Sequence, residues 1–170
     1  ASPDGCLIDA FKLPKDSASN RLCVTVHAYT PYYFALASDQ YITEFDRSSK
    51  TDIDTMFSEL NGKYMSKGIP VIVDEMGASN RNNTSDRTKW ADYYWNVASK
   101  YPATACCIWD NGISDNNGNP SNGEVHGYFD RNSGRVLFPE IFEAIMKHVD
   151  GTPAKSAGGS VVTPSTQAPT

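Results

Sequence analysis

The sequence has no cluster of lysine or arginine residues, and its formal net charge is −5. Nucleic acids and anionic membrane surfaces are usually bound through a basic patch, so the composition argues against both as main partners. No apolar run approaches the roughly 20 residues that span a bilayer. No signal peptide is visible either, although a start at Ala1 rather than at Met leaves a processed or cut product open.

Metal-binding cysteine spacings are also absent. The four cysteines are Cys6, Cys23, Cys106 and Cys107, and none belongs to a zinc-type ligand set. Cys23 and Cys107 lie in apolar, strand-like runs, which predicts that they are buried free thiols. Cys106 and Cys107 are neighbours, so in a strand they face opposite ways. The sequence leaves open whether any of the four pair.

The chain has 170 residues, with 39% apolar and 21% charged, which is typical of one globular domain. We predict a folded domain over residues 1–151. Residues 152–170 are dominated by Pro, Ser, Thr, Ala and Gly, with no charge after Lys155. Such a segment cannot bury enough apolar surface to fold alone, so we predict a linker or tail there.

Strand-like and helix-like segments alternate along the domain. Strands are predicted over residues 21–29, 69–76 and 104–109. Helices are predicted from Thr51 or Asp52 to Tyr64, from 85 to 100, and from Pro139 to Gly151, with a short helical remnant over 9–14 and a hairpin over 125–138. This order predicts an α/β architecture with a parallel sheet.

Each predicted strand ends in side chains that can do chemistry. His27 and Tyr29, two residues apart, share one face of the first strand. The second strand is a continuous β-branched run, typical of burial on both faces, and it ends at Glu75. The third ends at Trp109. In (β/α) barrels the active site collects at the C-terminal strand ends. The alternatives are a surface acid, a core histidine and two packing aromatics, with Tyr32, Tyr33 and Phe34 as loop packing.

Three motifs together resemble the C-terminal half of a glycoside hydrolase family 5 endoglucanase. Val26-His27-Ala28-Tyr29-Thr30-Pro31-Tyr32 is similar to the family's sixth strand. Residues 70–78 are similar to its seventh strand, and Cys107-Ile108-Trp109-Asp110-Asn111-Gly112 to its eighth. The resemblance covers roughly residues 10–150. It implies strands six to eight, with their helices, of a (β/α)8 TIM barrel.

The same resemblance implies a function. It makes Glu75 the nucleophile of a retaining endo-β-1,4-glucan hydrolase, with His27, Tyr29 and Trp109 binding the substrate. Retaining glycosidases hold a nucleophile and an acid/base about 5–5.5 Å apart. A hydrogen bond from Tyr29 would keep Glu75 ionised. No metal or organic cofactor is implied, and the family suggests a secreted protein. Cellulose, mixed-linkage glucan, xyloglucan and mannan all fit as substrates.

The sequence departs from the family in two ways. Asp74 and Met76 flank the nucleophile where relatives usually have glycine and an aromatic residue. If both carboxylates faced one pocket, one pKa should rise, whereas strand alternation would point Asp74 away from Glu75. Ile108 also replaces a common tryptophan.

The second departure is the lack of the Asn-Glu-Pro motif that carries the general acid/base. A full barrel needs about 250 residues, so we expect half a barrel with an open apolar sheet face. It could pair with an N-terminal half, form a homodimer, or use Asp110, Glu124 or Asp74 as the acid. A catalytically inactive carbohydrate-binding half-barrel and an unrelated α/β enzyme remain as rivals.

Overall fold

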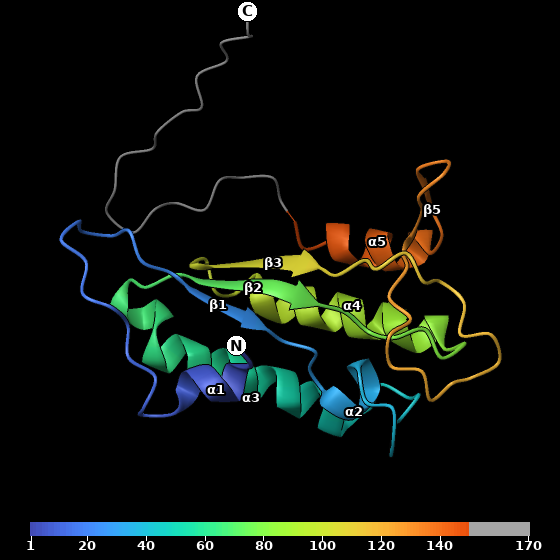
Figure 1. Cartoon of the computed structure of the whole chain (residues 1–170), viewed down its shortest axis with the longest axis horizontal. Helices are drawn as coiled ribbons and strands as arrows, with labels where there is room; N and C mark the ends of the chain where they lie inside the picture. Colours follow the sequence, from blue (N-terminus) through green and yellow to red (C-terminus); the bar gives the residue numbers. More distant parts are fainter. Residues whose placement is uncertain (150–170) are drawn as a thin grey trace, which may run out of the picture.

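A computed structural model describes residues 1–149 of the chain, and a three-stranded parallel sheet forms its centre (Figure 1). The strands are β1 (Val24–His27), β2 (Val71–Met76) and β3 (Thr104–Ile108), in the spatial order β1-β2-β3. Both pairings are parallel. The predicted α/β class with a parallel sheet is confirmed, and each strand occupies the interior of the range predicted for it.

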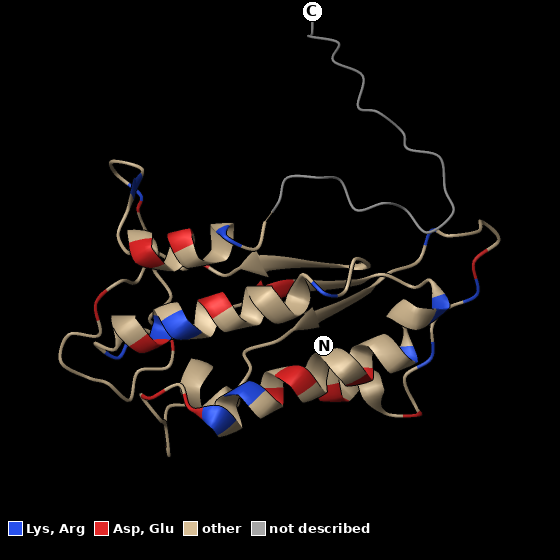
Figure 2. Ribbon diagram, turned by 180° about the vertical axis from the view of Figure 1, so that it is seen from behind, with Lys and Arg blue, Asp and Glu red and all other residues tan. Residues whose placement is uncertain are grey.

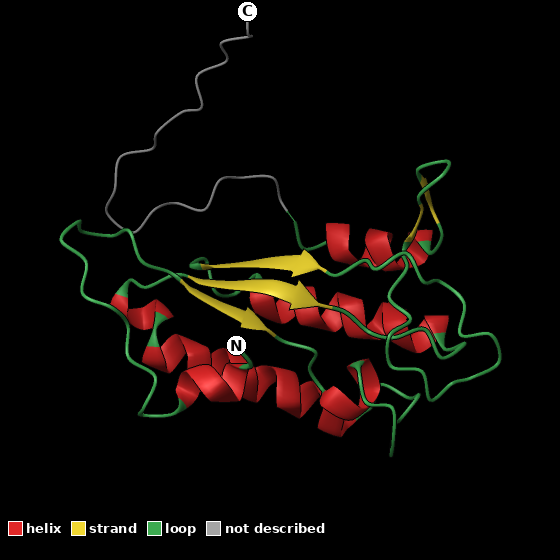
Figure 3. Cartoon of the chain, viewed as in Figure 1, coloured by secondary structure: helices red, strands yellow, loops and turns green. Residues whose placement is uncertain are grey.

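Two long helices cover one face of this sheet. Helix α3 (Arg47–Lys63) and helix α4 (Thr84–Ala98) lie on the same side of the strands, and α5 (Pro139–Met146) packs beside α4 (Figure 3). The predicted apolar stripes of α3 and α4 are buried: Ile53, Met56, Phe57, Leu60, Trp90, Tyr94 and Val97. They join one core with the inward-facing strand residues Val24, Val26, Val71 and Val73. Hydrophobic burial between the helices and the sheet therefore fixes the plane of the strands.

The start of α3 differs from the prediction. Asp46, not Thr51 or Asp52, caps the helix, because its side chain accepts a hydrogen bond from the backbone N–H of Ser49. The predicted end is confirmed. After the short 3-10 helix η1 (Met65–Lys67), Gly68 adopts φ +79°, the left-handed conformation that favours glycine.

Four short elements complete the described part of the chain: α1 (Pro3–Leu7), α2 (Tyr32–Ala35), β4 (Phe129–Asp130) and β5 (Arg135–Val136). The antiparallel pair β4–β5 confirms the predicted hairpin. The helical remnant expected over 9–14 is wrong. The helix forms earlier because Ser2 accepts from the N–H of Gly5 and Pro3 occupies the first turn. Gly151 and the predicted tail over 152–170 lie outside the described residues.

The second face of the sheet is uncovered within residues 1–149. Thr25, Ala105 and Cys107 are exposed on it, so the prediction that the strands are buried on both faces is wrong for this chain. The same geometry overturns the burial expected of Cys23 and Cys107, which are both exposed, whereas Cys6 is buried. The sheet has the open face expected of half a barrel.

Charged residues are concentrated on the helices and loops (Figure 2). Within the three-stranded sheet, Asp74 and Glu75 near the end of β2 are the only Asp, Glu, Lys or Arg residues. Within the described residues, no helix combines the length and apolar character needed to cross a membrane.

Strand β2 carries one residue more than its neighbours. Val26 pairs with Val73 but His27 pairs with Glu75, and a matching shift separates β2 from β3 between Val73 and Met76. This β-bulge interrupts the regular alternation of side chains where the two carboxylates lie.

Candidate active site

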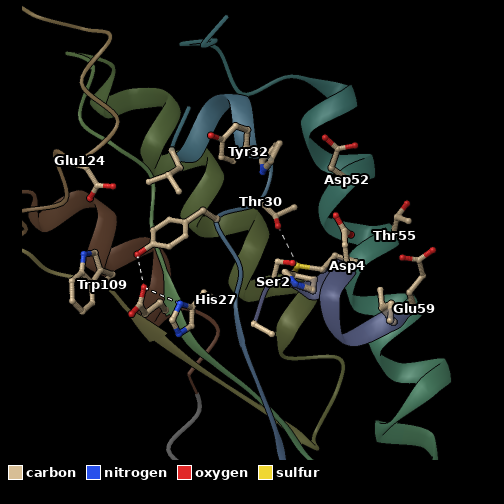
Figure 4. Close-up of a pocket in the computed structure, with 18 residues that line it drawn as sticks. Ser2, Asp4, His27, Thr30, Tyr32, Asp52, Thr55, Glu59, Trp109 and Glu124 are labelled. Carbon is tan, nitrogen blue, oxygen red and sulfur yellow. Dashed lines mark hydrogen bonds and ion pairs between the residues drawn. The ribbon is translucent and has the colours of Figure 1, made fainter. Parts of the chain in front are cut away.

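The C-terminal end of the sheet brings together the four residues predicted for the site. His27 ends β1, Tyr29 follows it, Glu75 lies near the end of β2, and Trp109 follows β3. All four line one cavity of about 900 Å³ (Figure 4). Parallel strands deliver their C-terminal residues to one edge, so side chains distant in sequence meet there.

Glu75 is held by two side chains from β1 and the loop that follows it. The hydroxyl of Tyr29 donates a hydrogen bond to Oε2 of Glu75 at 3.2 Å. Nδ1 of His27 lies 3.4 Å from the same oxygen. Burial raises the pKa of Tyr29, and the negative charge of Glu75 raises it further. The phenol therefore remains a hydrogen-bond donor throughout the neutral pH range.

The His27 ring lies between two carboxylates. Its Nδ1 faces Glu75, and its Nε2 lies 3.7 Å from Oδ1 of Asp74. The bulge in β2 explains this arrangement, since regular alternation would have turned Asp74 and Glu75 to opposite faces. Only Glu75 lines the cavity. Asp74 Oδ1 has no hydrogen-bond partner among the described residues, and Asp74 lies on the opposite side of the imidazole from Glu75.

Trp109 closes the other side of Glu75. Its backbone N–H donates to the carbonyl of Met76 at 2.7 Å, which ties it to the end of β2. Trp109 is 39% exposed and lines the cavity, so part of it is accessible to a ligand. A flat apolar ring in this position can stack on the axial C–H groups of a sugar, as the sequence predicts for Trp109.

Asp110 has a structural role. Its Oδ2 accepts hydrogen bonds from the backbone N–H groups of Tyr128 and Phe129, and its Oδ1 from Gly112 and Arg131. Burial alone would raise the pKa of Asp110, but the hydrogen bonds from Arg131 and the backbone outweigh it and hold the pKa below its usual value. A carboxyl so occupied is a poor general acid.

Of the three local acids considered from the sequence, only Glu124 lines the cavity, and it is exposed. Figure 4 shows Glu124 on the Trp109 side, while three further acids, Asp4, Asp52 and Glu59, lie across the cavity on α1 and α3. Among the described residues, no group of three or more His, Cys, Asp or Glu side chains is arranged so that it could hold a metal ion.

Two residues near the site were not predicted to belong to it. Tyr32, which we assigned to loop packing, is 55% exposed and lines the cavity, whereas Phe34 is buried as packing requires. His126 is fully buried, and its ring centroid lies 5.3 Å from that of Tyr29. No local sequence pattern predicts the position of His126, because Tyr29, the ring it contacts, lies 97 residues earlier in the chain.

Comparisons with known proteins agree with this geometry. The family model described as Cellulase (glycosyl hydrolase family 5) matches residues 2–115. Endoglucanase B of Neocallimastix patriciarum is 38% identical over 141 residues, covering 82% of this chain and 28% of that protein. Endoglucanase 1 of Ruminococcus albus is 38% identical over 152 residues, covering 88% of this chain and 34% of that protein.

Solved structures give the same result. A family 5 lichenase from Caldicellulosiruptor sp. F32 superposes with a TM-score of 0.77 at 39% identity, over 86% of this chain and 40% of that one. A broad-specificity endoglucanase from Ruminococcus champanellensis with bound cellotriose gives 0.71 at 34% identity, over 80% of this chain and 37% of that one. This chain therefore spans well under half the length of its relatives, and it has the fold of part of an α/β barrel. It belongs to glycosyl hydrolase family 5.

Proposed function

We propose that this chain is the nucleophile-bearing C-terminal half of a retaining endo-β-1,4-glucan hydrolase. One observation supports this most strongly. Oε2 of Glu75 accepts a hydrogen bond from the Tyr29 hydroxyl at 3.2 Å and lies 3.4 Å from Nδ1 of His27. Glu75 lines a cavity that Trp109 also lines. These two contacts hold one oxygen of the carboxylate in place, which orients Glu75 for attack on a sugar in the cavity.

The reaction follows from this placement. One carboxylate oxygen of Glu75 attacks the anomeric carbon of a sugar stacked on Trp109, and the bond to the leaving sugar breaks as a general acid protonates its oxygen. The ester formed between Glu75 and the sugar is then hydrolysed by water, which restores the carboxylate. Tyr29 and His27 orient Glu75 throughout.

We propose that the general acid comes from an N-terminal half-barrel that covers the open face of the sheet, with a second copy of this chain or Glu124 as the alternatives. Asp110 is excluded by its hydrogen bonds, and Asp74 does not line the cavity. A glucan polymer cannot enter a cell, so we also propose that the protein acts after secretion.

The experiment replaces each carboxylate of the pair separately. Glu75→Gln and Asp74→Asn are compared with the wild-type chain, alone and with an added N-terminal half, by release of reducing ends from carboxymethylcellulose and mixed-linkage glucan. We expect Glu75→Gln to lower kcat by at least about 10³-fold, since the nucleophile is lost. Asp74→Asn should retain most activity. Wild-type rates in Glu75→Gln would reject the assignment.

A carbohydrate-binding half-barrel without catalysis is the second candidate. It is favoured by one observation, namely that two exposed aromatic residues, Tyr32 and Trp109, line the cavity. Glucan binding lost in Trp109→Ala, together with no reducing ends at high protein concentration even when an N-terminal half is added, would identify this function instead.

A further inference from the structure

Behind the cavity, one short segment touches all three strand ends of the site. Residues 125–129 follow the long loop after Trp109, and we refer to them as the bracing segment. The backbone N–H groups of Tyr128 and Phe129 donate to Asp110, next to Trp109. The Tyr128 hydroxyl bonds to both the N–H and the carbonyl of Ala78, just beyond Glu75. His126 supplies the third contact, to Tyr29.

The His126 ring is fixed on two sides. Nε2 lies 2.9 Å from the carbonyl of Gly123, so this nitrogen carries the hydrogen and donates it. Nδ1 is then left without a hydrogen, and it has no hydrogen-bond partner among residues 1–149. It faces Gly77, where an added Cβ would lie 2.9 Å from it. The ring therefore fills the space between the Gly77 backbone and the phenol of Tyr29.

The surroundings keep this imidazole neutral. Burial lowers the pKa of His126 to about 4, and the positive charges of Arg87 and Arg81 act in the same direction, against the hydrogen bond to Gly123. Arg87 donates from Nε to the carbonyl of Ala78 and lies over the Tyr128 ring at 4.9 Å. An uncharged ring with one bare nitrogen can approach the Gly77 backbone more closely than a protonated one.

We propose that His126 is a positioning residue, whose ring holds the Tyr29 phenol against Glu75 by packing between Tyr29 and Gly77. This role rests on the proposed function of Glu75 and Tyr29, and it acts through Tyr29 without contact with the substrate. Tyr29 lies in the segment that follows β1, and the tilted contact with His126 at 5.3 Å restricts the orientations open to its ring.

A double-mutant cycle on kcat tests the proposal in the chain completed by an N-terminal half. Tyr29→Phe should lower kcat about tenfold or more, since a hydrogen bond to a charged group is lost. His126→Asn removes the part of the ring that reaches Tyr29, together with the Nε2 donor to Gly123, and it should lower kcat severalfold. In the Tyr29→Phe background, His126→Asn should change kcat less than twofold.

Val125→Ala is the matched control, because Val125 is equally buried in the same segment. It should change kcat by the same factor in both backgrounds, as a general structural effect would. Equal factors for His126→Asn in both backgrounds would overturn the proposal. His126→Gln, which is larger, provides a second variant should His126→Asn fail to fold.

A second measurement is independent of catalysis. NMR relaxation of 13C-labelled tyrosine in the chain itself should show the Tyr29 ring becoming mobile in His126→Asn but not in Val125→Ala. An unchanged Tyr29 ring would overturn the proposal even in an active enzyme. Full activity of Glu75→Gln would instead remove the proposed function, while the ring measurement would still decide whether His126 holds Tyr29.

Discussion

The Tyr29 hydroxyl and the Glu75 carboxylate are 46 residues apart in sequence and 3.2 Å apart in space. The contact joins the end of β1 to the end of β2 in the same cavity. His27 approaches the same carboxylate oxygen, but its side chain is 49% exposed. Water therefore competes more strongly with the His27 contact than with the Tyr29 hydrogen bond, and the His27 contact should contribute less free energy.

We expect Tyr29→Phe to reduce kcat/KM more than His27→Ala. A partly buried hydrogen bond to a charged group contributes about 1.5–3 kcal/mol, which corresponds to roughly ten- to 150-fold. An exposed ion pair contributes about 1 kcal/mol or less, so its loss lowers the rate about fivefold or less. Steady-state kinetics on a soluble glucan measures both variants. A larger effect of His27→Ala would mean that His27 contacts the reacting sugar.

Trp109→Ala should weaken substrate binding more than it weakens the fold. The indole is 39% exposed, so its removal leaves little cavity in the core, whereas a bound sugar would lose its apolar platform. Loss of about 1–2 kcal/mol of apolar contact predicts a roughly five- to thirtyfold rise in KM. Glucan binding and urea unfolding measured on the same protein separate the two effects. A matched control is Trp90→Ala, at a fully buried tryptophan of α4, which should chiefly lower the free energy of unfolding.

His126 predicts a pH dependence of stability. Its pKa is about 4 in the folded protein, because burial disfavours the charged ring, and about 6.5 in the unfolded chain. The folded state thus binds fewer protons between these values, so stability contributed by the neutral ring is present above pH 6.5 and is lost as the pH falls to about 4. The difference amounts to about 3 kcal/mol. Urea unfolding at pH 7, 5.5 and 4 should show a smaller decline in His126→Asn than in the wild type.

Two glycine substitutions should have opposite effects. A Cβ on Gly77 would lie 2.9 Å from Nδ1 of His126, so Gly77→Ala should displace that ring and cost about 1–3 kcal/mol. Gly62 lies within α3, and an added Cβ there meets nothing within 4 Å. Gly62→Ala should therefore stabilise the protein by about 0.5–1 kcal/mol through helix propensity. Thermal unfolding measures both, and a stabilising Gly77→Ala would contradict the packing described for His126.

The alternation of strands and helices could be predicted because each long helix carries its own apolar stripe and each strand its own β-branched run. The start of α3 could not, since Asp46, Thr51 and Asp52 are all chemically suitable caps and no local pattern ranks one above the others. Helix α1 has five residues, too few for any periodicity to show.

The site divides in the same way. His27, Tyr29, Glu75 and Trp109 are found from the sequence because each ends a strand, and parallel strand ends meet. His126 is not, because its position depends on a loop whose path is set by long-range contacts, and Tyr32 is not, because it begins the short helix α2 where the sequence predicts a loop. The strand pattern alone predicts burial of Cys107, because a strand reads the same whether or not a second layer covers it; the open face follows instead from the expectation of half a barrel.

The bulge in β2 also determines how many carboxyl groups lie beside His27. In a regular strand, successive side chains point to opposite faces, so one carboxylate of a neighbouring pair would point toward the helices. The extra residue lets Asp74 and Glu75 approach one imidazole from its two nitrogens, so both carboxyl groups lie beside the same ring. The environment of Glu75 can therefore be altered at position 74 without replacing either side chain that contacts its carboxylate.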